Sequence, residues 1–235
     1  MRKICIIVGH GRSKGGGYDS GAVSKDGKVH EFRVAREIAR CAVEHLKANY
    51  SVEADIMNYN GNLYLTDRIK EVNKSDYDFV AEIHLNAGGG KGTEVFYYHD
   101  SPTGLKVANE IAKEISSEFS IPNRGAKVRL NDSGKDYFAI IRDTKPCAVL
   151  VETVFIDNES ELNIINTTEG HKRSGSAIAR GIATAMNLKE KEVPKPADKK
   201  VLYRVQVGAY ANKSGAEAMK AGLEKLGFEA IIVEA

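Results

Sequence analysis

The chain has 235 residues, of which 42% are hydrophobic and 28% are charged, an ordinary composition for a globular protein. Its 34 Lys and Arg residues nearly balance its 32 Asp and Glu residues, which gives a formal net charge of +2. This balance excludes the strongly basic surface of a dedicated nucleic-acid-binding protein. No apolar run approaches the roughly 18 residues of a membrane span, so no membrane partner is expected.

The N-terminal sequence MRKICIIVGHG places two basic residues before a short apolar stretch, residues 4–8. This stretch is too short for the hydrophobic region of a signal peptide, and no small-residue cleavage site follows it. It predicts a first β-strand, in a protein made without a signal peptide. Cys5, Cys41 and Cys147 lie far apart among apolar neighbours, so we expect buried free thiols rather than a disulfide or a metal-binding pair.

Short apolar runs alternate with helical patterns up to residue 188. Strands are expected at residues 3–8, 51–57, 79–85, 93–98 and 148–155. Helices are expected where apolar residues recur at helical spacing: after Glu31, after the helix-start signal Asp100-Ser101-Pro102, and over residues 169–186. Strands that alternate with helices predict an α/β fold with a central, mostly parallel sheet flanked by helices.

A change of composition divides the chain near its C-terminus. Residues 189–200, KEKEVPKPADKK, contain five lysines, two of the five prolines and one large apolar residue, Val193. This composition predicts an extended linker, which separates a domain of residues 1–188 from a tail of residues 201–235.

The tail has the pattern of one β-α-β unit. Alternating residues predict a strand over 201–210, and apolar residues predict another over 228–233. Between them, Ser214 and Glu217 form a capping box that begins a helix, and Gly227 ends it. A unit of 35 residues is below the size that usually folds without partners.

Polar residues at strand ends are candidates for chemistry, because ligands bind outside the carboxyl ends of parallel strands. His10 follows the first strand within a GHG motif, His84 ends the third strand, and Glu31 opens the first helix. Two histidines and a carboxylate are a set that zinc binds, with the fourth position left for water at a catalytic site. Glu152 lies in the apolar strand AVLVETVF, where burial is expected to raise its pKa towards that of a general base.

Each residue also has a structural interpretation. His10 and His84, taken singly, are more typical of hydrogen-bonded structural histidines, and Glu31 is typical of a first-turn carboxylate that the helix dipole favours. His30 adjoins Glu31 and is the residue that can exchange roles with it.

Glu152 is harder to explain by structure alone, because an unpaired buried carboxylate is costly. Its alternative to a catalytic role is a buried ion pair with Arg142 or Arg68.

The glycine-rich stretch GRSKGGG lacks the P-loop pattern and does not lead directly into a helix, so a nucleotide site is not favoured. The tyrosine-rich loop 59–64 is expected to cover the sheet.

Several blocks occur together in one order: GHG…GGYDSGAV, TDRIKEVN, AEIHLNAGGGKGTEVFYY and IIRDTKPCAVLVETVFIDNESE. With Glu31 at the head of a helix, residues 1–188 resemble the zinc-dependent N-acetylmuramoyl-L-alanine amidases of the Amidase_3 type. The resemblance implies that His10, Glu31 and His84 bind Zn²⁺ and that Glu152 is catalytic. It also implies a substrate contact for Arg142. The extra residues RSKGGG and Val154 depart from the family pattern. These departures bear on the shape of the substrate groove and not on the proposed ligands.

The tail resembles the first half of a SPOR domain, a peptidoglycan-binding module built from two β-α-β halves. The resemblance implies a wall hydrolase, either a phage endolysin or a lytic amidase of sporulating bacteria. It would cleave the amide between N-acetylmuramic acid and L-alanine in peptidoglycan. We expect it to be made in the bacterial cytoplasm, to act on the wall after release, and to self-associate through the tail. The alternatives are a zinc peptidase acting on stem peptides and a non-enzymatic wall-binding protein.

Overall fold

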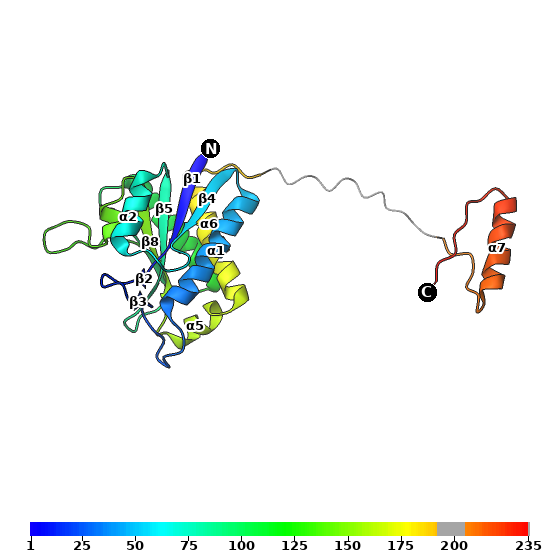
Figure 1. Ribbon diagram of the computed structural model, residues 1–235, viewed down its shortest axis with the longest axis horizontal. Coiled ribbons are helices and arrows are strands. Elements are labelled where there is room, and N and C mark those ends of the chain that lie inside the picture. The colour runs from blue at the N-terminus through cyan, green and yellow to red at the C-terminus, as the bar shows by residue number, and fades with distance from the viewer. Residues whose placement is uncertain (192–204, 235) are drawn as a thin grey trace. The chain divides into compact units, whose positions relative to one another are not determined.

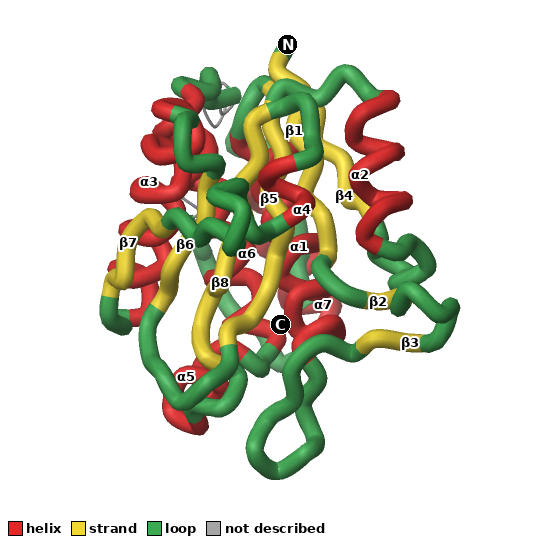
Figure 2. The backbone as a smooth tube through the Cα atoms, turned by 90° about the vertical axis from the view of Figure 1, so that its left-hand side faces the viewer, coloured by secondary structure: helices red, strands yellow, loops and turns green. Residues whose placement is uncertain are grey.

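The computed structural model describes residues 1–191 and 205–234, in two compact units, Met1–Glu192 and Val193–Ala235. The first unit is built around a six-stranded sheet in the order β4-β1-β5-β8-β6-β7. Figure 1 labels β4, β1, β5 and β8 of this sheet, and Figure 2 labels β6 and β7 as well. The strands are β1 (Arg2–Val8), β4 (Val52–Met57), β5 (Phe79–Asn86), β6 (Thr93–Tyr97), β7 (Asn123–Lys127) and β8 (Cys147–Phe155). All neighbouring strands are parallel except β6 and β8, so the predicted mostly parallel sheet is confirmed.

Helices cover both faces of this sheet (Figure 2). On one face, α1 (Glu31–Asn49), α3 (Pro102–Phe119) and α6 (Thr168–Met186) pack their apolar sides on alternate residues of β1, β5 and β8. On the other face, α2 (Leu65–Lys74) and the single turn α4 (Ala139–Arg142) cover a smaller core. Because α2 and α4 are short, they leave part of this second face open near the carboxyl ends of the strands.

The main helices begin where the sequence predicts. The Ser101 hydroxyl accepts a hydrogen bond from the Gly104 amide at 2.9 Å, and Pro102 occupies the first turn of α3. The sequence analysis missed the short strands β2 (Gly11–Arg12) and β3 (Tyr18–Asp19), the edge strand β7, α2, α4 and α5 (Glu159–Ile165). Most of these elements are too short to show a clear hydrophobic period.

Part of the expected linker belongs to the first unit. The Ser51 amide donates to the Lys189 carbonyl at 2.8 Å, and the Lys191 amide donates to the Asn49 carbonyl at 2.8 Å. Residues 189–191 are therefore attached to the junction of α1 and β4, while residues 192–200 lie outside the described residues.

The second unit contains α7 (Lys213–Lys225). Its N-cap is Asn212, whose side chain accepts a hydrogen bond from the Gly215 amide at 2.9 Å, so the predicted start at Ser214 is wrong. Gly227 ends the helix with a φ of +84°, as predicted. The strands expected over 205–210 and 228–233 are absent from the described residues 205–234, because no neighbouring strand supplies ladder hydrogen bonds there. The start of the first one, residues 201–204, lies outside the described residues.

All three cysteines are free; Cys5 and Cys41 are buried and Cys147 is half-buried. Among the described residues, each helix is too short or too polar to cross a bilayer.

Candidate active site

His10 lies in a sharp turn directly after β1. Its φ is +61°, a conformation unfavourable for residues other than glycine. The Asn58 amide group donates to the carbonyl of His10 at 2.8 Å, and an Arg68 guanidinium nitrogen donates to the same oxygen at 2.6 Å. A Cβ atom at Gly9 would lie 2.3 Å from the His84 ring, so glycine is required before His10. The turn thus brings the two imidazoles close together.

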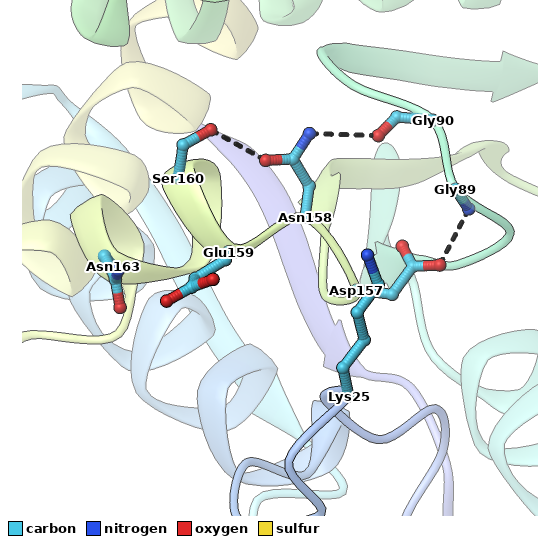
Figure 3. Close-up of a pocket in the computed structure, with 8 residues that line it drawn as sticks. All are labelled: Lys25, Gly89, Gly90, Asp157, Asn158, Glu159, Ser160 and Asn163. Atoms are coloured by element: carbon cyan, nitrogen blue, oxygen red, sulfur yellow. Dashed lines mark hydrogen bonds between the residues drawn. The ribbon is translucent and has the colours of Figure 1, made fainter.

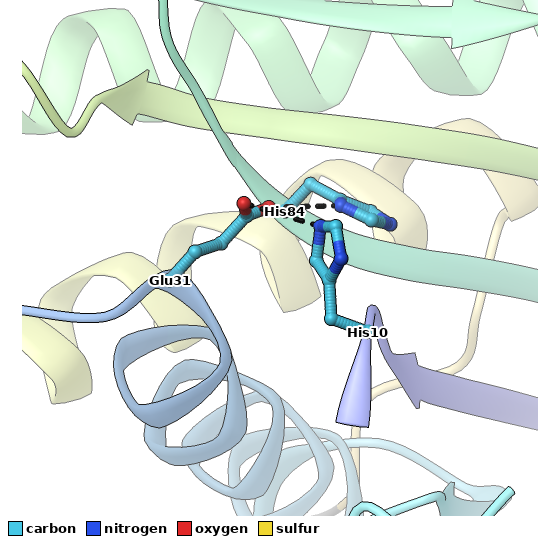
Figure 4. Close-up of side chains that lie close together, drawn as sticks. All are labelled: His10, Glu31 and His84. Carbon is cyan, nitrogen blue, oxygen red and sulfur yellow. Dashed lines mark hydrogen bonds and ion pairs between the residues drawn. The ribbon is translucent and has the colours of Figure 1, made fainter. Parts of the chain in front are cut away.

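Glu31, the first residue of α1, joins the two histidines. Its Oε2 lies 3.1 Å from Nε2 of His10 and accepts the Ala22 amide at 2.7 Å. Its Oε1 lies 2.9 Å from Nδ1 of His84 and accepts the Leu85 amide at 3.0 Å. One ligand atom from each of His10, Glu31 and His84 lies within 4.8 Å of the other two (Figure 4). Glu31, not the neighbouring His30, completes this group.

Each histidine also faces an outer carboxylate. Nδ1 of His10 hydrogen-bonds to Asp19 at 2.9 Å, and Asp19 is itself held by the Gly21 amide at 3.0 Å. Nε2 of His84 lies 3.7 Å from Oε1 of Glu82. Each ring therefore has one nitrogen near Glu31 and the other near a second carboxylate.

These carboxylates make the group a site for positive charge. Burial opposes protonation of His84, but its contacts with Glu31 and Glu82 outweigh burial, and its pKa is raised. Burial likewise opposes ionisation of Glu31, but its contacts with His10 and His84 outweigh it and lower its pKa.

Glu152 lies on β8, directly across from His84 on β5 and from Glu94 on β6. Its Oε2 is buried and has no hydrogen-bond partner among the described residues. Burial raises the pKa of Glu152 to about 7, and the nearby Glu31 and Glu94 act in the same direction. This is the direction expected for the pKa of a carboxyl in an apolar strand.

The alternative ion pair for Glu152 does not form. Arg68 contacts Glu82 at 3.0 Å, and Arg142 contacts Asp143 at 2.8 Å.

A pocket of about 400 Å³ unites the four predicted metal-binding and catalytic residues. It is lined by His10, Glu31, His84 and Glu152, and its walls include Tyr64, Leu65, Phe138 and Ile140 at the starts of α2 and α4. Tyr64 thus lines the pocket, whereas the sequence analysis expected its loop only to cover the sheet.

A second pocket, of about 500 Å³, lies where the loop after β5 meets the start of α5 (Figure 3). Asp157 accepts hydrogen bonds from the Gly88 and Gly89 amides at 2.9 and 2.7 Å, and Asn158 donates to the Gly90 carbonyl at 3.2 Å. These contacts hold the loop that follows His84, and the pocket contains none of the four predicted metal-binding and catalytic residues.

The sequence matches the N-acetylmuramoyl-L-alanine amidase family, Amidase_3, over residues 4–184. The chain belongs to this family. A SPOR domain matches residues 186–235. The predicted family, its enzyme class and the C-terminal SPOR resemblance are thereby confirmed.

Individual proteins of similar sequence or structure support the assignment to this family. The sporulation-specific N-acetylmuramoyl-L-alanine amidase of Bacillus subtilis is 29% identical over 99% of this chain and 85% of its own length. The endolysin of Bacillus phage SPP1 is 30% identical over 83% of this chain and 71% of its own. The catalytic domain of CwlV, an amidase from Bacillus (Paenibacillus) polymyxa var. colistinus, superposes with a TM-score of 0.68 and 27% identity over 80% of this chain and 100% of that domain.

Arg142 ends α4 away from the lining of the amidase pocket. Besides Asp143, its guanidinium binds the carbonyls of Asp136 and Tyr137 at 2.8 and 3.3 Å. These contacts fix the loop before α4, and the substrate contact expected for Arg142 stays a prediction.

The sequence analysis did not single out Asp19, Glu82 or Asn58. Glu82 carries the same signal as Glu152, a carboxylate inside a mostly apolar strand, FVAEIHLN. Asp19 ends the two-residue strand β3 and Asn58 directly follows β4, and only the folded chain shows that they contact His10.

Proposed function

We propose that this chain is a zinc-dependent wall amidase in which His10, Glu31 and His84 bind Zn²⁺ and Glu152 is the general base. One observation carries the proposal: the three side chains lie close together in one pocket, beside Glu152 on the neighbouring strand. The buried Oε2 of Glu152 has no hydrogen-bond partner among the described residues. The substrate bond is the amide between N-acetylmuramic acid and L-alanine of peptidoglycan.

The donor set fits zinc. Two imidazole nitrogens and one carboxylate are three typical zinc ligands, and three protein ligands leave a position for water. Carboxylates outside the ligand set, Asp19 and Glu82, match the usual partners of metal-binding histidines. Space is kept for this group at Gly21, where a Cβ atom would lie 2.5 Å from Oε2 of Glu31.

The chain's own residues supply the proton transfers. When bound, zinc supplies Lewis-acid polarisation of the scissile carbonyl and lowers the pKa of a water molecule. Glu152 accepts the proton of the attacking water at its free Oε2 and returns it to the departing amine of L-alanine. Burial raises the pKa of this carboxyl in the metal-free protein, and a bound cation would lower it towards the ionised form that accepts the proton. Tyr64, Leu65 and Phe138 line the same pocket and limit the access of other water molecules.

The C-terminal part is proposed to bind the wall. The SPOR match over residues 186–235 supports this role. We assign residues 1–191, which include the first three residues of the expected linker, to the catalytic unit. We assign residues 201–235 to a partial SPOR-like segment that brings the enzyme to peptidoglycan. Val205, Leu226, Phe228 and Ile231 are each more than half exposed within the second unit, which supports self-association of this segment. The enzyme would act on the wall after release from the cytoplasm of the bacterium.

The test uses purified cell walls and two chemical readouts. An amidase releases new N-terminal L-alanine and leaves the glycan strands intact, whereas a stem-peptide peptidase exposes other amino termini. Chelation is expected to abolish the release, and stoichiometric zinc is expected to restore it. A wall-binding protein without activity would release neither group, and persistent activity in the chelated protein would refute the zinc assignment.

A further inference from the structure

Arg68 and Glu82 form a buried ion pair in the wall of the catalytic pocket. Arg68 on α2 is 5% exposed and Glu82 on β5 is 1% exposed, and Nη2 of the arginine lies 3.0 Å from Oε1 of the carboxylate. A buried pair of this kind gains little net stability, because desolvation of both charges offsets their attraction. The proton transfers assigned to Glu152 do not involve either residue. Stability alone therefore gives no reason for a charge pair at this position.

Arg68 acts on the first histidine through its backbone. Its Nη1 donates to the His10 carbonyl at 2.6 Å, and the Asn58 side chain donates to the same oxygen. Two donors on one carbonyl fix the peptide plane of a residue that already has a positive φ. Because the imidazole extends from this fixed backbone, its Nε2 is held towards Glu31.

Glu82 acts on the second histidine through its side chain. Glu82 and His84 are two residues apart on β5, so their side chains emerge from the same face of the sheet. Oε1 of Glu82 lies 3.7 Å from Nε2 of His84, while Nδ1 of that ring lies 2.9 Å from Glu31. The carboxylate therefore faces the nitrogen that points away from Glu31.

We propose that Arg68 and Glu82 are a positioning pair that couples the two histidine ligands of the metal centre. Arg68 holds His10 by its carbonyl, Glu82 orients the imidazole of His84, and their mutual contact keeps both histidines at the separation that the metal ion requires. This inference rests on the proposed zinc site. Loss of an outer-shell partner typically lowers metal affinity by roughly 10- to 100-fold, and we expect the same range here.

The test replaces both charges together. Removing one partner would leave an unpaired buried charge, whereas apolar residues of similar size often preserve or increase stability. We therefore choose the double variant Arg68→Met/Glu82→Leu in the full chain. The readouts are the zinc dissociation constant, from competition with a chromophoric chelator at 25 °C, and the visible absorption spectrum of the Co²⁺-substituted protein. Neither depends on activity.

A matched control removes another arginine–glutamate pair between two elements. Arg180 on α6 lies 2.8 Å from Glu114 on α3, on the face of the sheet opposite to that of Arg68 and Glu82. The variant Arg180→Met/Glu114→Leu is expected to bind zinc with wild-type affinity. The variant Glu82→Gln removes the charge but keeps the size of the side chain and an amide oxygen that can still accept a hydrogen bond from Arg68.

The expected result is a folded double variant whose zinc dissociation constant is 10- to 100-fold higher than that of the wild type, with an altered Co²⁺ spectrum. Zinc affinity within twofold of wild type in a folded double variant would overturn the proposal. If the double variant does not fold, Glu82→Gln decides in the same way, with about tenfold weaker binding expected. Failure of the zinc site itself is distinguishable, because the wild-type protein and His10→Ala would then bind zinc equally weakly.

Discussion

The substitution Glu152→Gln is expected to change stability and activity in opposite directions. In the folded protein, burial raises the pKa of Glu152 from 4.5 to about 7. The folded state therefore favours the neutral acid. Ionisation of Glu152 destabilises the folded protein once the pH exceeds the pKa of this residue in the unfolded chain. Each unit between the two pKa values corresponds to about 1.4 kcal/mol, so ionisation of Glu152 lowers the free energy of unfolding by about 3 kcal/mol above pH 7. Glutamine keeps the shape and carries no charge.

The measurement is urea unfolding of the metal-free wild type and variant between pH 4 and pH 8. At pH 8 we expect Glu152→Gln to be about 3 kcal/mol more stable, and at pH 4 we expect the two proteins to be equal. Metal-free protein is required because a divalent cation nearby would lower the pKa of Glu152. The same variant, loaded with zinc, is expected to lose roughly 10²- to 10⁴-fold in hydrolysis, which corresponds to roughly 3–5 kcal/mol in the barrier.

Glu94→Gln is the matched control. Glu94 lies directly across from Glu152 on β6, but it accepts hydrogen bonds from Arg124 at 2.6 Å and from Asn86 at 2.8 Å. Losing a charge-assisted hydrogen bond costs roughly 1.5–3 kcal/mol, so this variant is expected to be less stable than wild type. A stability difference for Glu152→Gln that is zero or independent of pH would refute the buried-carboxyl argument. Hydrolysis within a few-fold of wild type would refute the assignment of the base.

Three further predictions concern the metal and the tail. His10→Ala, Glu31→Ala and His84→Ala should each lose zinc, measured by elemental analysis, together with activity, whereas His30→Ala should retain both; the reverse result for His30 and Glu31 would show that the ligand set is wrong. A chain ending after residue 191 keeps the contacts to α1 and β4, so it should remain folded and cleave soluble muropeptide fragments at the wild-type rate. It should bind intact walls less tightly in pelleting assays, and unchanged pelleting would contradict wall binding by the tail. The isolated residues 195–235 should sediment as a dimer or show little amide-exchange protection, because their apolar side chains lack a core of their own, and a stably folded monomer would contradict this.

Five of the six strands of the sheet were predictable because they are short apolar runs, whereas the edge strand β7, NRGAK, is polar and was missed. A strand buried on both faces, such as β8, is nearly continuously apolar. The tail shows the limit of the same reasoning. Alternation over 201–210 indicates a strand, but a strand forms only where a neighbouring strand pairs with it, and the described part, residues 205–210, has none. Local pattern therefore predicts what a segment can form, and tertiary pairing decides whether it does.

Strand position made His10 and His84 candidates, because the fold brings the carboxyl ends of β1 and β5 together, but only the resemblance to the amidase family implied that they bind zinc together with Glu31. Glu31 was a candidate from its place at the head of α1. The outer contacts were not predictable in this way. Asp19 reaches His10 through the hairpin of β2 and β3, and Asn58 reaches it across 48 residues of sequence. Such contacts depend on loop conformations that leave no periodic signal.

Glu82 and Glu152 show why the role of a buried carboxylate cannot be decided from its strand alone. Both lie in apolar strands, and their side chains reach the same pocket. Burial opposes ionisation of both, but the charge of Arg68 on α2 outweighs it at Glu82 and lowers the pKa of that carboxyl. No cation pairs with Glu152 among the described residues, and its pKa rises. A carboxylate held in an ion pair can orient its neighbours but exchanges protons poorly near neutral pH, whereas an unpaired one is free to accept and return a proton. The position of one arginine thus separates the positioning role proposed for Glu82 from the catalytic role proposed for Glu152, and that position is set by the packing of α2 in the smaller core.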